Sequence, residues 1–138
     1  MKPIESEKLL KEARELNKKY NFFINLNNKS GKGIPVSIKD NICTKNLTTT
    51  AGSKILENYV PPFNATVANL KDCYIVGKTS MDEFGFGSFS TNTFQVPKNP
   101  LDPTRTCGGS SGGSAGYVKA TKYSGFSITE STGGSISC

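Results

Sequence analysis

Two runs of small residues constrain this chain more than any other feature of its sequence. The first extends from Cys107 to Ser114 (CGGSSGGS) and the second from Ser131 to Ser135 (STGGS). Because glycine loses backbone entropy on folding, such runs indicate a close backbone approach, a positive φ, or a cradle of N–H groups around an oxyanion or a phosphate. Either run taken alone is as typical of a flexible linker.

The absence of histidine is the second constraint. It excludes Ser-His-Asp and Cys-His catalysis, so a general base has to be Lys, Asp, Glu or Tyr. Lys39 ends a short apolar stretch and is followed by Asp40 and Asn41, a setting that can hold an amine among polar groups. Because desolvation disfavours an ammonium, a buried lysine can activate a serine. Lys39 is therefore the candidate base, and Ser110 and Ser135 are the candidate serines.

Composition narrows the remaining function classes. The 138 residues suffice for one domain, and 17 Lys and Arg against 11 Asp and Glu give a net charge of +6. The basic residues are scattered, which favours a role in solubility over RNA contact. No apolar run is long enough to cross a bilayer, so we expect no membrane span. The acidic residues near the N-terminus are atypical of a signal or transit peptide.

Cysteine spacing argues against a metal centre. The four cysteines (Cys43, Cys73, Cys107 and Cys138) are widely separated and form no CxxC pair. With no histidine to complete a ligand set, we expect reduced thiols, no metal site and no cofactor bound by this chain. Cys107 and Cys138 are expected to be bystanders of the chemistry, since neither has a histidine partner.

Periodicity and breaker residues predict helices alternating with strands. Helices are expected over residues 4–20, over 64–72 with Asn64 as N-cap, from 79 onward and over 114–120; strands are expected over 33–41, 74–76 and 126–128; and a loop is expected over 21–32. This order favours an α/β layered domain. Residues 77–79 (GKT) resemble the end of a phosphate-binding loop, but Asp72 stands where that loop needs glycine, so they do not predict nucleotide binding.

Taken together, these motifs resemble the amidase signature family. The glycine- and serine-rich signature of that family is similar to residues 108–114 followed by 132–136, and its catalytic lysine lies in a segment similar to residues 33–41. Residues 77–84 (GKTSMDEF) and 99–102 (NPLD) make the resemblance strongest to the subgroup formed by the A subunits of glutamyl-tRNA(Gln) amidotransferases.

The resemblance implies a role for each candidate residue. Lys39 would be the base, Ser110 a bridging serine whose peptide bond with Gly109 is cis, and Ser135 the nucleophile that becomes acylated. Thr132, Gly133 and Gly134 would supply the oxyanion-hole amides. The implied reaction is amidase-type hydrolysis of glutamine, whose ammonia a partner subunit would use to convert Glu-tRNA(Gln) to Gln-tRNA(Gln).

The resemblance also implies a fold, partners and a compartment. The chain would be the N-terminal, incomplete part of an α/β/α layered fold with a mixed sheet, with residues 1–30 as a leading helix and loop and residues 33–138 as the catalytic-motif region. The implied partners are the other subunits of the complex, glutamine, and tRNA through the complex. ATP and magnesium would belong to a partner subunit. A mitochondrial matrix location is expected, with the cytoplasm as the alternative.

Several residues depart from the pattern of the family. Ser131 stands where an aspartate is usual, Ser137 stands where an arginine is usual, and residues 117–130 differ from the usual alanine-rich helix and strand. Two alternatives therefore stay open: a free-standing amidase acting on another amide, and a truncated inactive remnant or partner-binding fragment. Ser111, Ser114 and Asp40 stay undecided between turn or cap roles and support of the site.

Overall fold

A mixed sheet forms the centre of the computed structural model, which describes residues 1–137. Its strands are β1 (Ile4–Glu5), β2 (Phe23–Leu26), β3 (Lys32–Lys39), β4 (Cys73–Thr79) and β5 (Phe126–Ile128), and its helices are α1 (Ser6–Tyr20) and α2 (Gly112–Ala120). Short 3₁₀ turns occur at Lys54–Leu56 (η1), Thr66–Ala68 (η2) and Glu83–Gly85 (η3). The helices predicted over 4–20 and 114–120 and the three predicted strands are therefore confirmed.

Strand β3 lies at the middle of the sheet. It pairs in parallel with β4 on one side and with β5 on the other, while its first residues pair with β1 in the antiparallel sense. Strand β2 forms the far edge by pairing antiparallel with β4. The mixed sheet of an α/β fold is thus confirmed. Because β3, β4 and β5 are parallel, their carboxyl ends meet at one end of the sheet, which is where α/β proteins commonly place a site.

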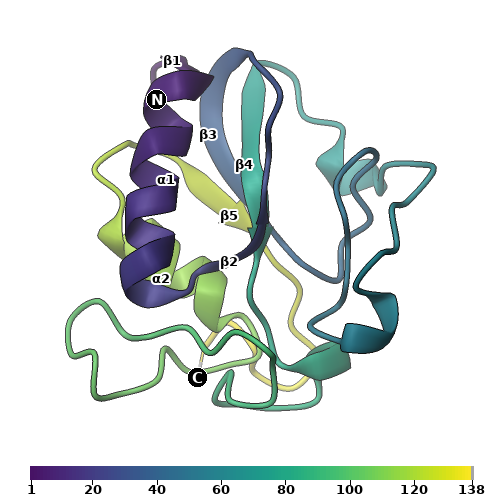
Figure 1. Ribbon diagram of the computed structural model, residues 1–138, viewed down its shortest axis with the longest axis vertical. Coiled ribbons are helices and arrows are strands. Elements are labelled where there is room, and N and C mark those ends of the chain that lie inside the picture. The colour runs from purple at the N-terminus through teal and green to yellow at the C-terminus, as the bar shows by residue number, and fades with distance from the viewer. Residues whose placement is uncertain (138) are drawn as a thin grey trace.

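The two helices lie on one face of the sheet, and the segment 40–72 lies on the other (Figure 1). On the helical face, the buried core consists of Leu9, Leu10, Ala13, Tyr20, Phe22, Phe23, Tyr74, Val76 and Tyr117. The apolar stripe of α1 supplies part of this core, as the helical spacing predicted. Within residues 1–137, the second face carries no helix longer than a 3₁₀ turn.

Three local predictions were wrong. The helix predicted over 64–72 is reduced to η2, because Asn64 accepts a hydrogen bond from Lys45 N (2.7 Å) instead of capping a helix. The helix predicted from residue 79 is absent, because Asp82 turns its carboxylate to the backbone N–H groups of residues 90 and 92. The predicted loop 21–32 contains β2, which forms through pairing with β4.

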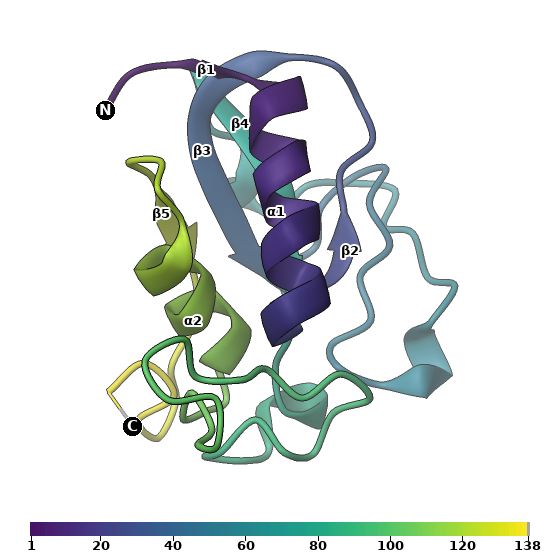
Figure 2. The same cartoon turned by 60° about the vertical axis from the view of Figure 1, so that its left-hand side comes forward.

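Both glycine-rich runs lie near the carboxyl end of β3. Figure 2 shows the arrowhead of β3 pointing toward the end of the molecule where the C-terminal segment and the turn before α2 lie. No helix among residues 1–137 has the length and apolar character needed to cross a bilayer.

Gly113 allows α2 to approach the sheet closely. A Cβ at Gly113 would lie 2.5 Å from Phe22 O and 2.6 Å from Ser80 N, and Gly113 N donates to Ser80 O at 3.1 Å. Because these neighbours are backbone atoms, they cannot rotate away from an added methyl group. We expect Gly113→Ala to lower the free energy of unfolding by about 1–3 kcal/mol, measured by urea denaturation. Gly133→Ala is the matched control, since a Cβ at Gly133 meets no described atom within 4 Å; equal losses in both variants would contradict this account.

Candidate active site

Lys39, Ser110 and Ser135 form a continuous chain of polar contacts. Lys39 Nζ lies 2.8 Å from Ser110 Oγ, and Ser110 Oγ lies 3.0 Å from Ser135 Oγ. Lys39 and Ser110 are fully buried, whereas Ser135 is half-buried. An amine is thereby linked through one hydroxyl to a second hydroxyl that solvent can reach, although the three residues come from distant parts of the chain.

Three different elements position these side chains. Lys39 is the last residue of β3, Ser110 stands in the turn before α2, and Ser135 stands in the second glycine-rich run. The Gly109–Ser110 peptide bond is cis. The backbone joins the two runs directly, since Ser111 N donates to Ser135 O at 3.2 Å.

The glycine-rich runs are ordered parts of the fold. Gly108 and Gly134 have φ values of 76° and 119°, a region that favours glycine. A Cβ at Gly109 would lie 2.4 Å from Asp82 Oδ2, so glycine is also needed there for a close approach. Ser90 Oγ in turn accepts from Gly112 N at 3.1 Å, which ties the loop after β4 to the first run. The linker interpretation of these runs is therefore excluded.

Glu130 is a further member of the site that sequence reasoning missed. Its Oε1 accepts from Lys39 Nζ at 2.7 Å and from Asn41 Nδ2 at 2.9 Å, and its backbone O accepts from Lys39 Nζ at 3.1 Å. The hydrogen bond from Lys39 lowers the pKa of the Glu130 carboxyl, as do the charge of Lys39 and the Asn41 amide. The sequence carries only a weak indication of this role, namely that Glu130 is an acidic residue immediately before the second glycine-rich run.

The predicted oxyanion-hole residues lie next to Ser135. Thr132 and Gly133 are exposed and Gly134 is half-buried. Within residues 1–137, no acceptor pairs with the backbone N–H groups of Thr132, Gly133 or Gly134. Free N–H donors beside a candidate nucleophile are suited to binding an oxyanion, and this role stays a prediction.

The three undecided residues have different surroundings. Ser114 Oγ lies 2.6 Å from Thr79 Oγ1 and so links α2 to the end of β4. Asp40 accepts from Thr50 N at 3.0 Å in a buried turn, and burial raises the pKa of its carboxyl. Ser111 Oγ is buried and has no partner among residues 1–137. Ser114 thus contacts the end of β4, and Asp40 contacts the turn that follows it.

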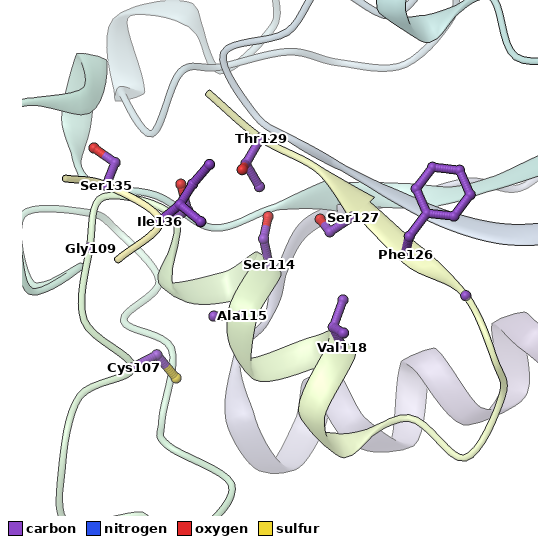
Figure 3. A pocket seen from close by; sticks show the side chains of 12 residues that line it. Cys107, Gly109, Ser114, Ala115, Val118, Phe126, Ser127, Thr129, Ser135 and Ile136 are labelled. Carbon is purple, nitrogen blue, oxygen red and sulfur yellow. The ribbon is translucent and has the colours of Figure 1, made fainter. Parts of the chain in front are cut away.

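A cavity of about 280 Å³ adjoins Ser135 (Figure 3). Ser135 and Ile136 lie at one end of it, and Val118 and Phe126 lie at the other, so that its wall is largely apolar. Within the described part of the chain, no group of three His, Cys, Asp or Glu side chains is placed to hold a metal ion.

Cys107 also lines this cavity, and the reactivity of its thiol tests the prediction that this cysteine takes no part in the chemistry. Burial raises the pKa of its thiol to about 11, so the thiol stays protonated near neutral pH, and only the thiolate reacts with iodoacetamide. At about pH 8 we expect Cys107 in the folded protein to be alkylated roughly 100-fold more slowly than in urea, with the rate rising toward alkaline pH. Peptide-resolved mass spectrometry measures both rates, and equal rates would contradict the burial of this thiol. Cys138 lies outside the described residues.

Comparison with known proteins gives consistent matches. A family model described as Amidase matches residues 4–138. A glutamyl-tRNA(Gln) amidotransferase A subunit of Clostridium acetobutylicum is 49% identical over 133 residues, which is 92% of this chain and 27% of that protein. The chloroplastic/mitochondrial A subunit of the same enzyme in Vitis vinifera is 49% identical over 137 residues, which is 95% of this chain and 24% of that protein.

A solved structure agrees with these matches. The crystal structure of the glutamyl-tRNA(Gln) amidotransferase A subunit from Thermotoga maritima has a TM-score of 0.73 and 43% sequence identity, covering 83% of this chain and 29% of that chain. The present chain spans roughly a quarter of the length of the curated relatives.

Proposed function

Because the chain belongs to the amidase family, we propose that it is the relay-bearing, N-terminal part of a subunit that hydrolyses glutamine for a tRNA-dependent amidotransferase. The observation that carries this proposal is that Lys39 contacts Ser110 and Ser110 contacts Ser135, so that Ser110 lies between the amine and the outer hydroxyl. The names of the relatives from Clostridium acetobutylicum and Vitis vinifera support the choice of substrate.

In the proposed mechanism, Ser135 Oγ attacks the side-chain amide carbon of glutamine. The proton of Ser135 passes to Ser110 Oγ while the proton of Ser110 passes to the neutral amine of Lys39. Backbone N–H groups of residues 132–134 hold the oxyanion that forms on the amide oxygen. As the tetrahedral intermediate collapses, the nitrogen of the amide takes a proton back through Ser110 and leaves as ammonia.

The second half of the reaction regenerates the serine. Water attacks the acyl group on Ser135 and gives up a proton to Lys39 through Ser110. As the tetrahedral intermediate collapses, that proton returns through Ser110 to Ser135 Oγ, so glutamate is released and the hydroxyl of Ser135 is restored. The ammonia then serves a partner subunit that converts Glu-tRNA(Gln) to Gln-tRNA(Gln). ATP and magnesium belong to that partner in this proposal, and no step on this chain uses them. The matrix of mitochondria is the proposed location, with the cytoplasm as the alternative.

The direct test is ammonia release from glutamine by the longest natural polypeptide that contains this chain, alone and with the partner subunits. We expect ammonia, a covalent glutamyl adduct on Ser135, and conversion of misacylated tRNA when the partners are added. Release of ammonia from other amides, with no preference for glutamine, would support the free-standing amidase instead. A folded protein that releases no ammonia under either condition would overturn the proposal and favour the inactive remnant.

A further inference from the structure

Among the described residues 1–137, Lys39 Nζ makes three polar contacts, and only one of them belongs to the proposed relay. It lies 2.8 Å from Ser110 Oγ, 2.7 Å from Glu130 Oε1 and 3.1 Å from Glu130 O. An ammonium group has three N–H donors and no lone pair, so these contacts use every donor it has. Lys39 is fully buried whereas the Glu130 side chain is 41% exposed. These three acceptors can therefore satisfy every donor of an ammonium at this position.

In this arrangement the hydrogen bonds run from Lys39 outward to Ser135, which is the direction expected before the reaction starts. Lys39 donates to Ser110 Oγ, and Ser110 Oγ donates to Ser135 Oγ. Attack on an amide requires the reverse order, in which Ser135 donates to Ser110 and Ser110 donates to a neutral amine. A carboxylate in direct contact favours the charged form of a lysine, and a charge-assisted hydrogen bond is stronger than a neutral one. Glu130 therefore stabilises the protonation state that cannot start the reaction.

The same two acceptors also suit the active form. When the ammonium passes one proton along Ser110 and Ser135 toward solvent, the amine keeps two N–H groups, and Glu130 Oε1 and Glu130 O can accept both. The lone pair is then left facing Ser110 Oγ, where the relay needs it. Asn41 Nδ2 holds the Glu130 carboxylate in place through its contact of 2.9 Å with Oε1.

From this geometry we infer that Glu130 is a positioning residue, whose two oxygens aim the amine of Lys39 at Ser110 and whose charge favours the resting, proton-donating form of the relay. The inference rests on the proposed function and adds a residue that the relay of Lys39, Ser110 and Ser135 does not include. It predicts that the pH dependence of the activity changes when this one carboxylate loses its charge.

The other charged groups around Lys39 have partners of their own. Asp40 faces Lys78 and the N–H groups of its own turn. Asp82 accepts from two backbone N–H groups, and Glu83 of η3 accepts from the hydroxyl of Ser53 at 2.5 Å. Among residues 1–137, Glu130 is the single carboxylate in an ion pair with Lys39. A change at Glu130 therefore acts on that amine more directly than a change at any of these other carboxylates.

The test compares Glu130→Gln with the wild type in the longest natural polypeptide that contains this chain, together with its partner subunits. The readout is the pH dependence of kcat/KM for ammonia release from glutamine. The glutamine side chain keeps an acceptor oxygen but removes the charge, so we expect the rise of kcat/KM to move to lower pH by about one unit. Glu130→Asp, which keeps the charge, is expected to restore the wild-type profile.

Glu12→Gln is the matched control. Glu12 is a buried carboxylate that accepts from Thr121 Oγ1 at 2.8 Å and from Lys122 N at 2.9 Å, contacts that join α1 to the end of α2. The same chemical change is made there without touching Lys39, so the pH profile should stay where it is in the wild type. A Glu130→Gln profile that overlays the wild type, or that moves to higher pH, would overturn the inference.

A second readout separates this inference from the proposed function. A fluorophosphonate probe labels an activated serine without any need for glutamine, and peptide mapping locates the label on Ser135. If the wild type releases no ammonia but labels Ser135, the proposed substrate is wrong, and the pH dependence of labelling still decides the role of Glu130. Glu130→Ser replaces Glu130→Gln if the latter fails to fold. No labelling at any pH would overturn both the relay and the inference.

Discussion

Replacing Lys39 by methionine is expected to lower kcat/KM for glutamine by about 10³-fold or more, the scale typical for loss of one member of a serine relay. Methionine keeps the length of the buried stem but removes the amine that contacts Ser110. Glu130 then loses its cationic partner, and because its side chain is 41% exposed, water can solvate the carboxylate and the fold is retained. Ammonia release, with circular dichroism to verify folding, measures the effect.

Lys32→Met is the matched control for this experiment. Lys32 stands at the opposite end of β3 and pairs with Glu5 at 3.3 Å, where both side chains are more than half exposed. Surface ion pairs of this kind contribute little to stability, so activity should stay within about twofold of the wild type. An undiminished rate in the Lys39→Met protein would require the proton relay to be abandoned.

The second large effect concerns Lys78, a lysine of β4 that has no role in the proposed reaction. Lys78 is fully buried on the face covered by residues 40–72, where its Nζ donates to Ile42 O, to Thr44 Oγ1 at 3.1 Å and to Thr49 Oγ1 at 3.0 Å. Burial lowers its pKa from 10.5 to about 8, and the nearby Asp40 opposes part of that shift. The GKT segment thus lies within a strand and forms no phosphate-binding loop.

The sign of the resulting pH dependence follows from proton binding. Between the folded pKa of about 8 and the unfolded pKa of 10.5, the unfolded chain binds a proton that the folded chain lacks. Stability therefore rises with pH across this window, by about 3 kcal/mol from Lys78, and this contribution is lost as pH falls through the folded pKa.

Urea unfolding of the wild type and of Lys78→Met at a series of pH values measures this contribution. Tyr117 and Cys107, whose pKa values burial raises, titrate in both proteins, so their effects cancel in the difference. We expect the free energy of unfolding of the wild type to rise relative to that of Lys78→Met as the pH increases from about 8 to 10.5. The same pH dependence in both proteins would show that Lys78 is solvated in the folded state.

The sequence by itself determined the features that depend on residue type and local spacing. Without histidine, the base had to be another side chain, and the two glycine-rich runs placed Ser110 and Ser135 in segments where a close backbone approach, a positive φ or a cradle of N–H groups was expected. The apolar spacing of α1 and the pattern before Lys39 predicted a helix and a strand that the structure contains. These signals are local, because they reflect backbone freedom and the periodicity of one element at a time.

Only the tertiary structure decided which side chains meet Lys39. Strand β5 pairs with β3, and this pairing brings Glu130 onto an amine that lies 91 residues earlier. Strand β2 and the burial of Lys78 likewise depend on pairing with, or packing against, segments remote in sequence. Such contacts arise from the closure of long loops around a sheet. The local sequence around each participating residue does not indicate which distant residue it will contact.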